Sequence, residues 1–576
     1  MKKVSSSVLC VLLVLGSMVQ ASVSLKAKSE YLVKGLGDVT PAYNEFDGEM
    51  YAGMIPIHND TDKNTNQREG EIMFWLFAPR KPLVPNTLVK WLNGGPGCSS
   101  FQCGNLFETG PVTVPLNPAG WCCATEDEPL QVNEYAWTSR TYMLFVEQPV
   151  GVGFSWGPMP QTEDDVADDM VGWLHNFFTI FEELQTFDFY IVGESYAGMY
   201  APAIARGIHH ANRRNDNVEN DHGRTINLKG IGLGNGWIDV EIQGSAVIHY
   251  AWWHGMIDQR QRDAFMQEWN TCLYSSPVNP QHKEEDNHLI DKPYHAFTTP
   301  EECGIEAAIL KAAGQDIWKG KLEPNTYDVT TWDAYPVIQG ANTTTFQQFY
   351  NNPAVQKALN APVGVFWEGC VPGAGRRRRL EHIGRRRRLQ GEPGSIMLDN
   401  DRPLSVLPYI AELLDDTDIR VLVYNADMDM SVCAQGSENS LTAMQWSGAE
   451  DWATQERGLW TTDTQVDKVA GYAKEVKGLT FVVVRNSGHM VPYNQPLNGL
   501  DLLTRFLRNE SFVDHALPFY TADELLAAET KTKSARESFV TWRDILVYAV
   551  LLVAGFGVGY LASNQSRRDG YESVKH

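Results

Sequence analysis

A serine held in a tight turn between a strand and a helix is the feature that most constrains this chain. Residues 189–192 have the apolar pattern of a buried strand, Gly193-Glu-Ser195-Tyr-Ala197 follows, and residues 200–209 have a helical pattern. Small residues on both sides of Ser195 are needed because strand and helix backbones nearly touch there, and Ala197 stands where a second glycine is usual. The pattern is typical of a nucleophile elbow, which places the serine at the carboxyl end of a strand.

Short β-rich runs alternate with longer helical stretches from about residue 45 to 507, which predicts an α/β core with a mostly parallel sheet. Residues 240–353 break this rhythm, are rich in Trp, Tyr and His, show little strand pattern and are interpreted as an inserted helical cap. The expected strands include Ile72–Ala78, Leu88–Leu92, Tyr142–Glu147, Phe189–Val192, Gly230–Leu233, Ile419–Tyr424 and Thr480–Val484.

A duplicated basic segment interrupts the pattern again within residues 375–394. Arg376–Arg379 and Arg385–Arg388 supply eight arginines that cannot be buried, so a solvated loop is expected. Such runs are cut by basic-site processing proteases in the secretory pathway, which would make such a protease a partner and leave two chains. The alternative is an uncut inserted loop.

Both ends of the chain indicate the secretory pathway. Lys2 and Lys3, an apolar run and the small residue Ala21 predict a signal peptide over residues 1–21, followed by a lead-in over 22–44. Ile545–Ala562 carries no charge and predicts a transmembrane helix, with a buried core helix as the alternative. The main domain, 45–515, and a stalk, 516–544, would then be lumenal and the tail, 563–576, cytosolic. We expect a single-pass protein of a Golgi, vacuolar or lysosome-like membrane.

Composition narrows the function classes. The chain has 71 acidic against 48 basic residues and a net charge of −23, which argues against a nucleic-acid surface. Its 43% hydrophobic content excludes a disordered chain. No metal-ligand pattern such as H-E-x-x-H is present, so neither a metal nor another cofactor is expected. Gly555 and Gly559 form a GxxxG pair, a pattern that lets two membrane helices pack closely in a homodimer.

Modification sites follow from the lumenal location. Of nine cysteines Cys10 lies in the signal peptide, and the others are expected to form disulfides in an oxidising compartment, with no pairing fixed by sequence. Asn59, Asn342 and Asn509 begin N-x-Ser/Thr sequons and are expected to carry glycans.

Three further strand ends carry groups that a serine nucleophile needs. Strand 419–424 runs into Asp427-Met-Asp429, and strand 480–484 into Ser487-Gly-His489. A serine attacks only when a histidine takes its proton, and a carboxylate must orient that histidine. Strand 88–92 leads into Asn93–Ser100, whose paired glycines let backbone N–H groups approach an oxyanion, although a purely structural turn is the alternative. The sequence therefore predicts an acyl-transfer site.

Three segments, Trp91–Ser100, Gly193–Gly198 and Ser487–Pro492, resemble the signature blocks of the serine carboxypeptidases. Glu147–Ser155, Gly234–Gly236 and Asn351–Asn360 are also similar to family segments, so the resemblance runs in order from about residue 45 to 515. It implies an α/β-hydrolase fold, and the signal peptide and single span resemble the membrane-anchored processing type.

The resemblance also implies a role for each site residue. Ser195 would be the nucleophile, His489 the base and Asp429 the orienting acid, with oxyanion N–H groups from Gly95 and Tyr196. Asn93, Gly94 and Glu194 would bind the substrate's terminal carboxylate, and Glu108 would hydrogen-bond Glu194. A glutamate can do so only when protonated, which a paired, partly buried carboxyl favours, so peptidase activity at acidic pH is expected.

The resemblance implies a Cys98–Cys370 disulfide, and a Cys272–Cys303 bridge is expected within the cap. Four cysteines stay unassigned: Cys103, Cys122, Cys123 and Cys433.

The first functional hypothesis is a serine-type carboxypeptidase that removes C-terminal residues from peptides or proteins, including basic residues left after proprotein cleavage. The alternatives are an acyltransferase with the same triad and a non-catalytic stabilising partner on the same fold. Intact Asn93 and Glu194 favour peptide substrates over acyl transfer. Intact Ser195, Asp429 and His489 argue against a dead scaffold.

Overall fold

The computed structural model describes ten parts of the chain: 25–58, 68–114, 130–216, 225–275, 304–313, 324–332, 344–370, 405–462, 465 and 468–513. The expected signal peptide, arginine loop, stalk, transmembrane segment and tail lie outside these residues. Within them, no helix combines the length and the apolar character that crossing a membrane requires.

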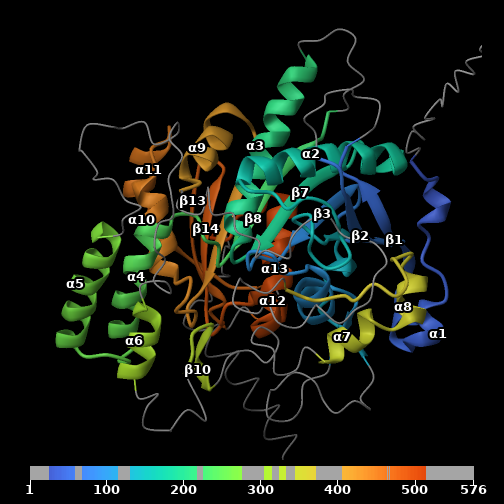
Figure 1. The fold of residues 1–576 in the computed structure, drawn as a ribbon. Coiled ribbons are helices and arrows are strands. Elements are labelled where there is room, and N and C mark those ends of the chain that lie inside the picture. The colour runs from blue at the N-terminus through green and yellow to red at the C-terminus, as the bar shows by residue number, and fades with distance from the viewer. Residues whose placement is uncertain are drawn as a thin grey trace, which may run out of the picture. The chain divides into compact units, whose positions relative to one another are not determined.

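The described residues form a ten-stranded sheet in the order β1-β2-β6-β3-β7-β8-β11-β14-β13-β12 (Figure 1). The central strands from β6 to β14 run parallel, and antiparallel pairs extend the sheet at both edges. All seven expected strands are present, whereas β1, β12 and β13 were not predicted. The bounds are β1 Gly48–Pro56, β2 Glu71–Pro79, β3 Thr87–Leu92, β6 Tyr142–Val146, β7 Asp188–Glu194, β8 Leu228–Gly234, β11 Arg420–Ala426, β12 Gly458–Trp460, β13 Gly471–Val476 and β14 Leu479–Val484.

The register of the parallel strands brings their carboxyl ends to one edge. Leu92 of β3 pairs with Gly193 of β7, and Glu194 pairs with Gly234 of β8. On the other side of β8, Gly234 pairs with Tyr424 of β11. The residues that follow these strands are therefore neighbours in space, which is where open parallel sheets build their sites.

The predicted elbow is present between β7 and α3 (Ala197–Asp216), a helix longer than the expected run. Ser195 has a φ of +64°, a conformation that non-glycine residues seldom adopt, and its N–H donates to the Gly234 carbonyl at 2.9 Å. A Cβ atom on Gly198 would lie 2.4 Å from the Trp237 carbonyl oxygen. Glycine at this position thus lets α3 start directly against the loop that follows β8.

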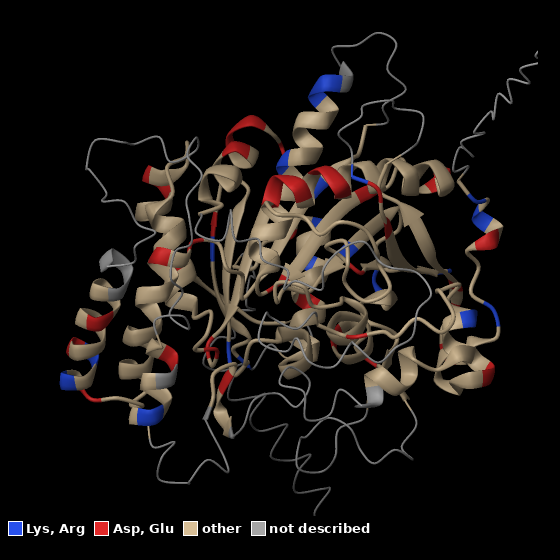
Figure 2. Ribbon diagram, viewed as in Figure 1, with Lys and Arg blue, Asp and Glu red and all other residues tan. Residues whose placement is uncertain are grey.

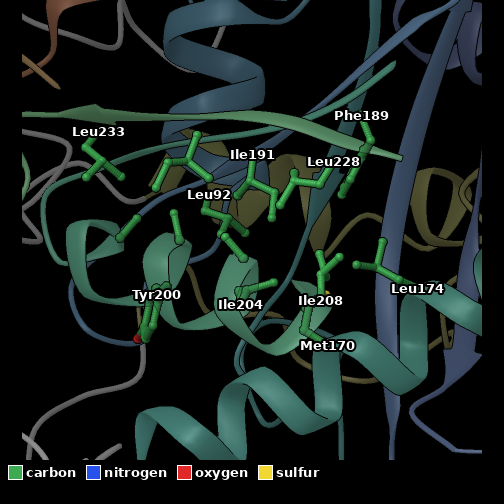
Figure 3. Close-up of a cluster of buried hydrophobic side chains, with 14 of the residues drawn as sticks. Leu92, Met170, Leu174, Phe189, Ile191, Tyr200, Ile204, Ile208, Leu228 and Leu233 are labelled. Carbon is green, nitrogen blue, oxygen red and sulfur yellow. The ribbon is translucent and has the colours of Figure 1, made fainter. Parts of the chain in front are cut away.

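Two apolar layers enclose the sheet. On one face, α2 (Glu163–Ile180), α3 and α9 (Leu407–Asp416) pack against the central strands. Figure 3 shows this layer, with Leu92 and Ile191 of the sheet facing Ile204 of α3. The other face is covered by α13 (Pro496–Arg508) and by η3 (Phe101–Thr109), a π-helix.

Both α2 and α9 are rich in acidic residues (Figure 2), of which Asp164, Asp168, Asp415 and Asp416 are exposed. At the start of α2, the side chain of Thr162 accepts from the Asp165 N–H at 3.0 Å and forms a capping box. Acidic side chains in this first turn also interact favourably with the positive end of the helix dipole.

The expected cap segment, 240–353, contains more than helices. It includes α4 (Val240–Trp253), α5 (Gln259–Ser275), α6 (Ile305–Ala312) and α7 (Thr344–Tyr350). The first three pack around a separate apolar cluster. A short antiparallel pair, β9 (Pro324–Asn325) and β10 (Asp328–Trp332), was missed because its strands are short and largely polar.

Short elements complete the described parts: η1 Lys28–Glu30, α1 Leu36–Val39, η2 Pro41–Glu45, β4 Val112–Thr113, β5 Gln131–Val132, η4 Trp137–Ser139, η5 Glu182–Leu184, α8 Pro353–Ala358, α10 Ala434–Ala443, α11 Ala449–Thr454 and α12 Val491–Asn494.

One core position conflicts with its surroundings. Lys90 of β3 is 0% exposed, and its neighbours on the flanking strands are Leu144 and Ile191. Within the described residues, its ammonium group has no hydrogen-bond partner. Burial lowers the pKa of Lys90 well below its usual value, because a charge in an apolar layer is poorly solvated.

Lys90→Met should therefore stabilise the protein. We expect the free energy of unfolding to rise by about 1–3 kcal/mol at about pH 7, the usual cost of an unsatisfied buried polar group. Since the pKa of Lys90 is lower in the folded than in the unfolded state, wild-type stability should increase as the pH approaches about 10.4. The difference in the free energy of unfolding between Lys90→Met and the wild type should therefore be smaller at high pH than at about pH 7.

Urea unfolding at about pH 7 and about pH 9.5 measures both effects. Lys357→Met, on the exposed side of α8, is the control and should change little. An equal advantage at both pH values, or none at neutral pH, would contradict the argument.

Candidate active site

A histidine and an aspartate from neighbouring strand ends form a buried pair. Nδ1 of His489, after β14, lies 2.6 Å from Oδ2 of Asp429, after β11. His489 is 2% exposed and Asp429 0%. An imidazole whose Nδ1 donates to a carboxylate keeps Nε2 available as a proton acceptor. This is the geometry of a general base with its orienting acid.

Three further donors hold the Asp429 carboxylate. Asn235 Nδ2 donates at 2.7 Å to Oδ2, the oxygen that also faces His489. The N–H groups of Ser431 and Val432 donate to Oδ1 at 2.9 and 3.3 Å. A buried carboxylate needs such partners because it has lost its hydration.

Asn235 is a site residue to which the sequence assigned no role. It follows β8 directly, has a φ of +41°, and its Oδ1 accepts from the Ala426 N–H at 3.2 Å. Its position between Gly234 and Gly236, at the end of a predicted strand, is the sequence feature that could have identified it as a site residue. Its partner, however, lies almost two hundred residues further along the chain.

The insertion also reaches this pair. The His489 N–H donates to the Tyr327 carbonyl at 2.7 Å, and the two rings have centroids 4.8 Å apart. The Val329 N–H donates to the Met428 carbonyl at 3.0 Å. Segments of the hairpin β9–β10 therefore brace both loops that carry the acid and the base.

Ser195 lies at the carboxyl end of β7 and is partly exposed, whereas His489 and Asp429 are buried. The loop Asn93–Ser100 passes directly beside it. A Cβ atom on Gly94 would lie 2.9 Å from the Ser195 Cβ and 2.3 Å from the Tyr196 nitrogen. Gly95 has a φ of +116°, which favours glycine. The two expected oxyanion donors thus lie on segments that contact each other: Gly95 on the glycine loop and Tyr196 in the turn that carries Ser195.

A pair of carboxyl groups lies beside these residues. Glu194, next to the serine, and Glu108 of η3 are hydrogen-bonded through their side chains and are 3% exposed each. Asn93 Nδ2 donates to Glu108 Oε1 at 3.4 Å. Trp91 Nε1 and the Gly104 N–H both donate to Asn93 Oδ1 at 2.9 Å, which fixes the orientation of the amide. All three predicted carboxylate-binding side chains are therefore together.

Burial controls the protonation of this pair. It raises the pKa of Glu194 well above its usual value, and the neighbouring charge of Glu108 raises it further. Burial also raises the pKa of Glu108 to about 7, although hydrogen bonds from Glu194 and Asn93 oppose the shift. The charge of Asp429 also raises the pKa of Glu194, so the carboxyl pair is electrostatically linked to the acid that orients His489.

The helix η3 places Glu108 in this centre. All nine of its residues are buried, and it begins right after the loop Asn93–Ser100. Its π-helical winding is uncommon and is found frequently at functional sites. Phe107 stacks on Tyr493 with centroids 4.2 Å apart, which ties η3 to α12.

Cys98 and Cys370 are joined by a disulfide, the pairing that the resemblance implied. Cys103 and Cys433 are buried and have no disulfide partner among the described residues. The Cys272 side chain, Cys303, Cys122 and Cys123 lie outside them, as do Asn59 and Asn342. Asn509 is exposed at the end of α13.

The described residues contain one group with metal-ligand spacing, His209, Glu412 and Asp416. Arg206 donates to Glu412 at 2.7 Å, and His210 Nε2 lies 2.5 Å from its other oxygen. Both carboxylate oxygens are thus already engaged by neighbouring side chains.

Comparison with known proteins agrees with this geometry. The family model described as serine carboxypeptidase matches residues 41–509. A probable serine carboxypeptidase CPVL from Pongo abelii is 29% identical over 461 residues, covering 79% of this chain and 83% of that protein. The pheromone-processing carboxypeptidase KEX1 of Zygosaccharomyces rouxii is 30% identical over 501 residues, covering 82% of this chain and 65% of that protein.

Among solved structures, a prohormone-processing carboxypeptidase from Saccharomyces cerevisiae, Kex1(delta)p, has the same fold. The TM-score is 0.67 at 24% identity, over 84% of this chain and 97% of that one. Because the family model spans most of the chain, the protein belongs to the serine carboxypeptidases, hydrolases that remove the C-terminal residues of peptides.

Proposed function

We propose that Ser195, His489 and Asp429 are the catalytic triad of this carboxypeptidase. His489 takes the proton of the Ser195 hydroxyl as the serine attacks the last peptide bond, and later returns it to the leaving amine. Asp429 orients the imidazole and stabilises its positive form. The 2.6 Å contact between Asp429 and His489 supports these roles.

The N–H groups of Gly95 and Tyr196 then stabilise the oxyanion of the tetrahedral intermediate. This role is supported by the close approach of Gly94 to Ser195, which brings the glycine loop to the serine. Backbone donors that are fixed before the reaction stabilise developing charge without reorganisation.

The hydrogen-bonded set of Asn93, Glu194 and Glu108 is the observation that carries an exopeptidase function. A protonated glutamate and an amide can both donate to the free carboxylate of a peptide's last residue. Such a set beside the nucleophile favours a peptidase over an acyltransferase or a non-catalytic partner. Since the pKa of each glutamate is raised, the donating forms are present at acidic pH. Glu108 loses its proton as the pH rises through about 7, and the pKa of Glu194 also lies well above its usual value.

Blocked peptides ending in Lys, Arg, Phe or Leu, each with a free or amidated C-terminus, test this proposal. We expect the free acids to be cleaved with a kcat/KM about 10- to 100-fold higher than the amides, the value of a hydrogen bond to a charged group. KM for the free acids should rise above about pH 7, because ionised Glu108 would repel the substrate carboxylate. KM for the amides should not.

Ser195→Ala should abolish the release of residues, and Glu108→Gln, which cannot ionise, should remove the rise in KM. Glu45→Gln, at an exposed position, is the matched control. A rise in KM that persists in Glu108→Gln would exclude this carboxyl as its source. Wild-type protein that a serine-reactive phosphonate labels but that cleaves no peptide would favour acyl transfer.

Asn235 offers a test of the triad itself. Asn235→Ala removes one donor from the Asp429 carboxylate, so His489 is held less firmly. We expect kcat to fall about 10- to 100-fold with little change in KM, the effect of losing a hydrogen bond to a charged group. Asn227→Ala, just before the other end of β8, also removes two side-chain hydrogen bonds and should leave kcat unchanged. Equal losses in both variants would indicate a general effect on folding.

Residue preference and location belong to the same proposal. The relative named as a pheromone-processing carboxypeptidase supports a role in processing, and we propose that this chain trims basic residues after proprotein cleavage. The Lys- and Arg-ending peptides above test this preference directly. The chain's acidic balance and the raised glutamate pKa values support work in an acidic lumen.

We also propose that residues 545–562 anchor the protein as a single transmembrane helix, with the catalytic domain in the lumen. Their uncharged run and the N-terminal leader support this topology. After alkaline carbonate extraction the full chain should stay with membranes, and a chain ending at Glu537 should be released. Release of both would exclude the anchor, and a glycan at exposed Asn509 marks the lumenal side.

A further inference from the structure

A further buried carboxylate contacts the glycine loop Asn93–Ser100. Glu147, the first residue after β6, is 0% exposed. Its Oε1 accepts from Ser99 Oγ at 2.7 Å and from Trp367 Nε1 at 2.6 Å. Its Oε2 accepts from the Phe154 N–H at 2.7 Å. Each of its three partners is a donor, so the surroundings suit an ionised carboxylate.

The backbone around Glu147 is shaped to admit it. Gly153 has a φ of +58°, and a Cβ atom there would lie 1.9 Å from Glu147 Oε1. The Ser155 hydroxyl donates to the Glu147 carbonyl at 2.6 Å and accepts from the Met73 N–H at 2.9 Å. Any side chain at position 153 would displace the carboxylate.

Glu147 is kept without a neighbouring cation among the described residues. Burial raises the pKa of Tyr350, whose ring packs on Trp367 with centroids 4.4 Å apart, and the charge of Glu147 contributes to this shift. Burial raises the pKa of Glu147 to about 7, while its three hydrogen bonds oppose that shift. Desolvation of a carboxylate is unfavourable, and no ion pair within the described residues offsets it here. We therefore expect a structural or functional role that depends on this carboxylate.

The three donors connect separate parts of the chain. Ser99 belongs to the loop Asn93–Ser100, and its N–H donates to the Gly369 carbonyl at 2.6 Å. Trp367 stands three residues before Cys370, whose disulfide holds Cys98 of the same loop. Glu147 Oε1 therefore links the end of β6 both to the glycine loop and to the segment that clamps it.

We propose that Glu147 is a positioning residue for the oxyanion hole. By holding Ser99 and Trp367 with one oxygen, it fixes the glycine loop and thereby the distance from the Gly95 N–H to Ser195. This inference rests on the proposed oxyanion role of that loop. The residue touches neither substrate nor nucleophile and acts through Ser99.

Glu147→Gln tests the proposal with almost no change in volume. An amide must direct its NH2 group either at the Phe154 N–H or at the donors of Ser99 and Trp367, so one contact becomes donor against donor. We expect kcat, per site titrated with phosphonate, to fall about 10- to 100-fold at unchanged KM, as for a small displacement of a catalytic group. Phosphonylation of Ser195 should slow by a similar factor, because the phosphonyl oxygen occupies the same hole.

Asp501→Asn is the matched control. Asp501 Oδ2 also accepts from a tryptophan, Trp460 Nε1, at 2.9 Å, but this residue of α13 makes no hydrogen bond to the glycine loop. Its loss should lower the Tm without changing kcat per titrated site. Normal kcat and normal phosphonylation in Glu147→Gln, whatever its Tm, would overturn the proposal.

Ser99→Ala keeps the test decisive if Glu147→Gln does not fold. It removes one of the three donors and should lower kcat about 10-fold, again without changing KM. An unchanged kcat in this variant would also overturn the proposal. If wild-type protein cleaves no peptide, the proposed function fails, whereas the phosphonylation rates still report on Glu147.

Discussion

The structure depends on the close approach of three backbone segments at the carboxyl edge of the parallel sheet. Gly94, Ser195 and the loop after β8 come so near one another that a Cβ atom on Gly94 or Gly198 would overlap a backbone atom. The approach requires parallel strands in register, because a shift of one residue would carry the serine away from the loop. Strain at Ser195 is tolerated because its N–H and carbonyl are both hydrogen-bonded.

This edge also concentrates buried carboxyl groups, and each is accommodated differently. Asp429 is held by His489, an amide and two backbone donors. Glu194 and Glu108 lie against each other, and the pKa of each is raised, so both carry a proton at acidic pH. Glu147 has three donors. Burial disfavours the ionised form of each carboxyl group. The number of hydrogen-bond donors around the group therefore determines whether it stays ionised or binds a proton.

The sequence predicts the centre of this fold better than its edges. Buried parallel strands such as β7 and β11 are continuous apolar runs, which are easy to recognise. The strands β1, β12 and β13 pair antiparallel at the edges, and the hairpin β9–β10 is short and polar, so neither gives a strong pattern. Residues of the elbow and the histidine loop were predicted because their chemistry is local. The roles of Asn235 and Glu147 were not, because their partners are distant in sequence.

The raised pKa values of Glu108 and Glu147 have opposite consequences for activity under the proposed roles. Ionisation of Glu108 above about pH 7 weakens the binding of the substrate carboxylate and so enters KM. Protonation of Glu147 below about pH 7 adds a hydrogen where three donors already converge, and so loosens the glycine loop and enters kcat. Acidity therefore helps recognition and opposes positioning. The three hydrogen bonds to Glu147 favour its ionised form, but its pKa and that of Glu108 both lie at about 7, so the two requirements oppose each other around that pH.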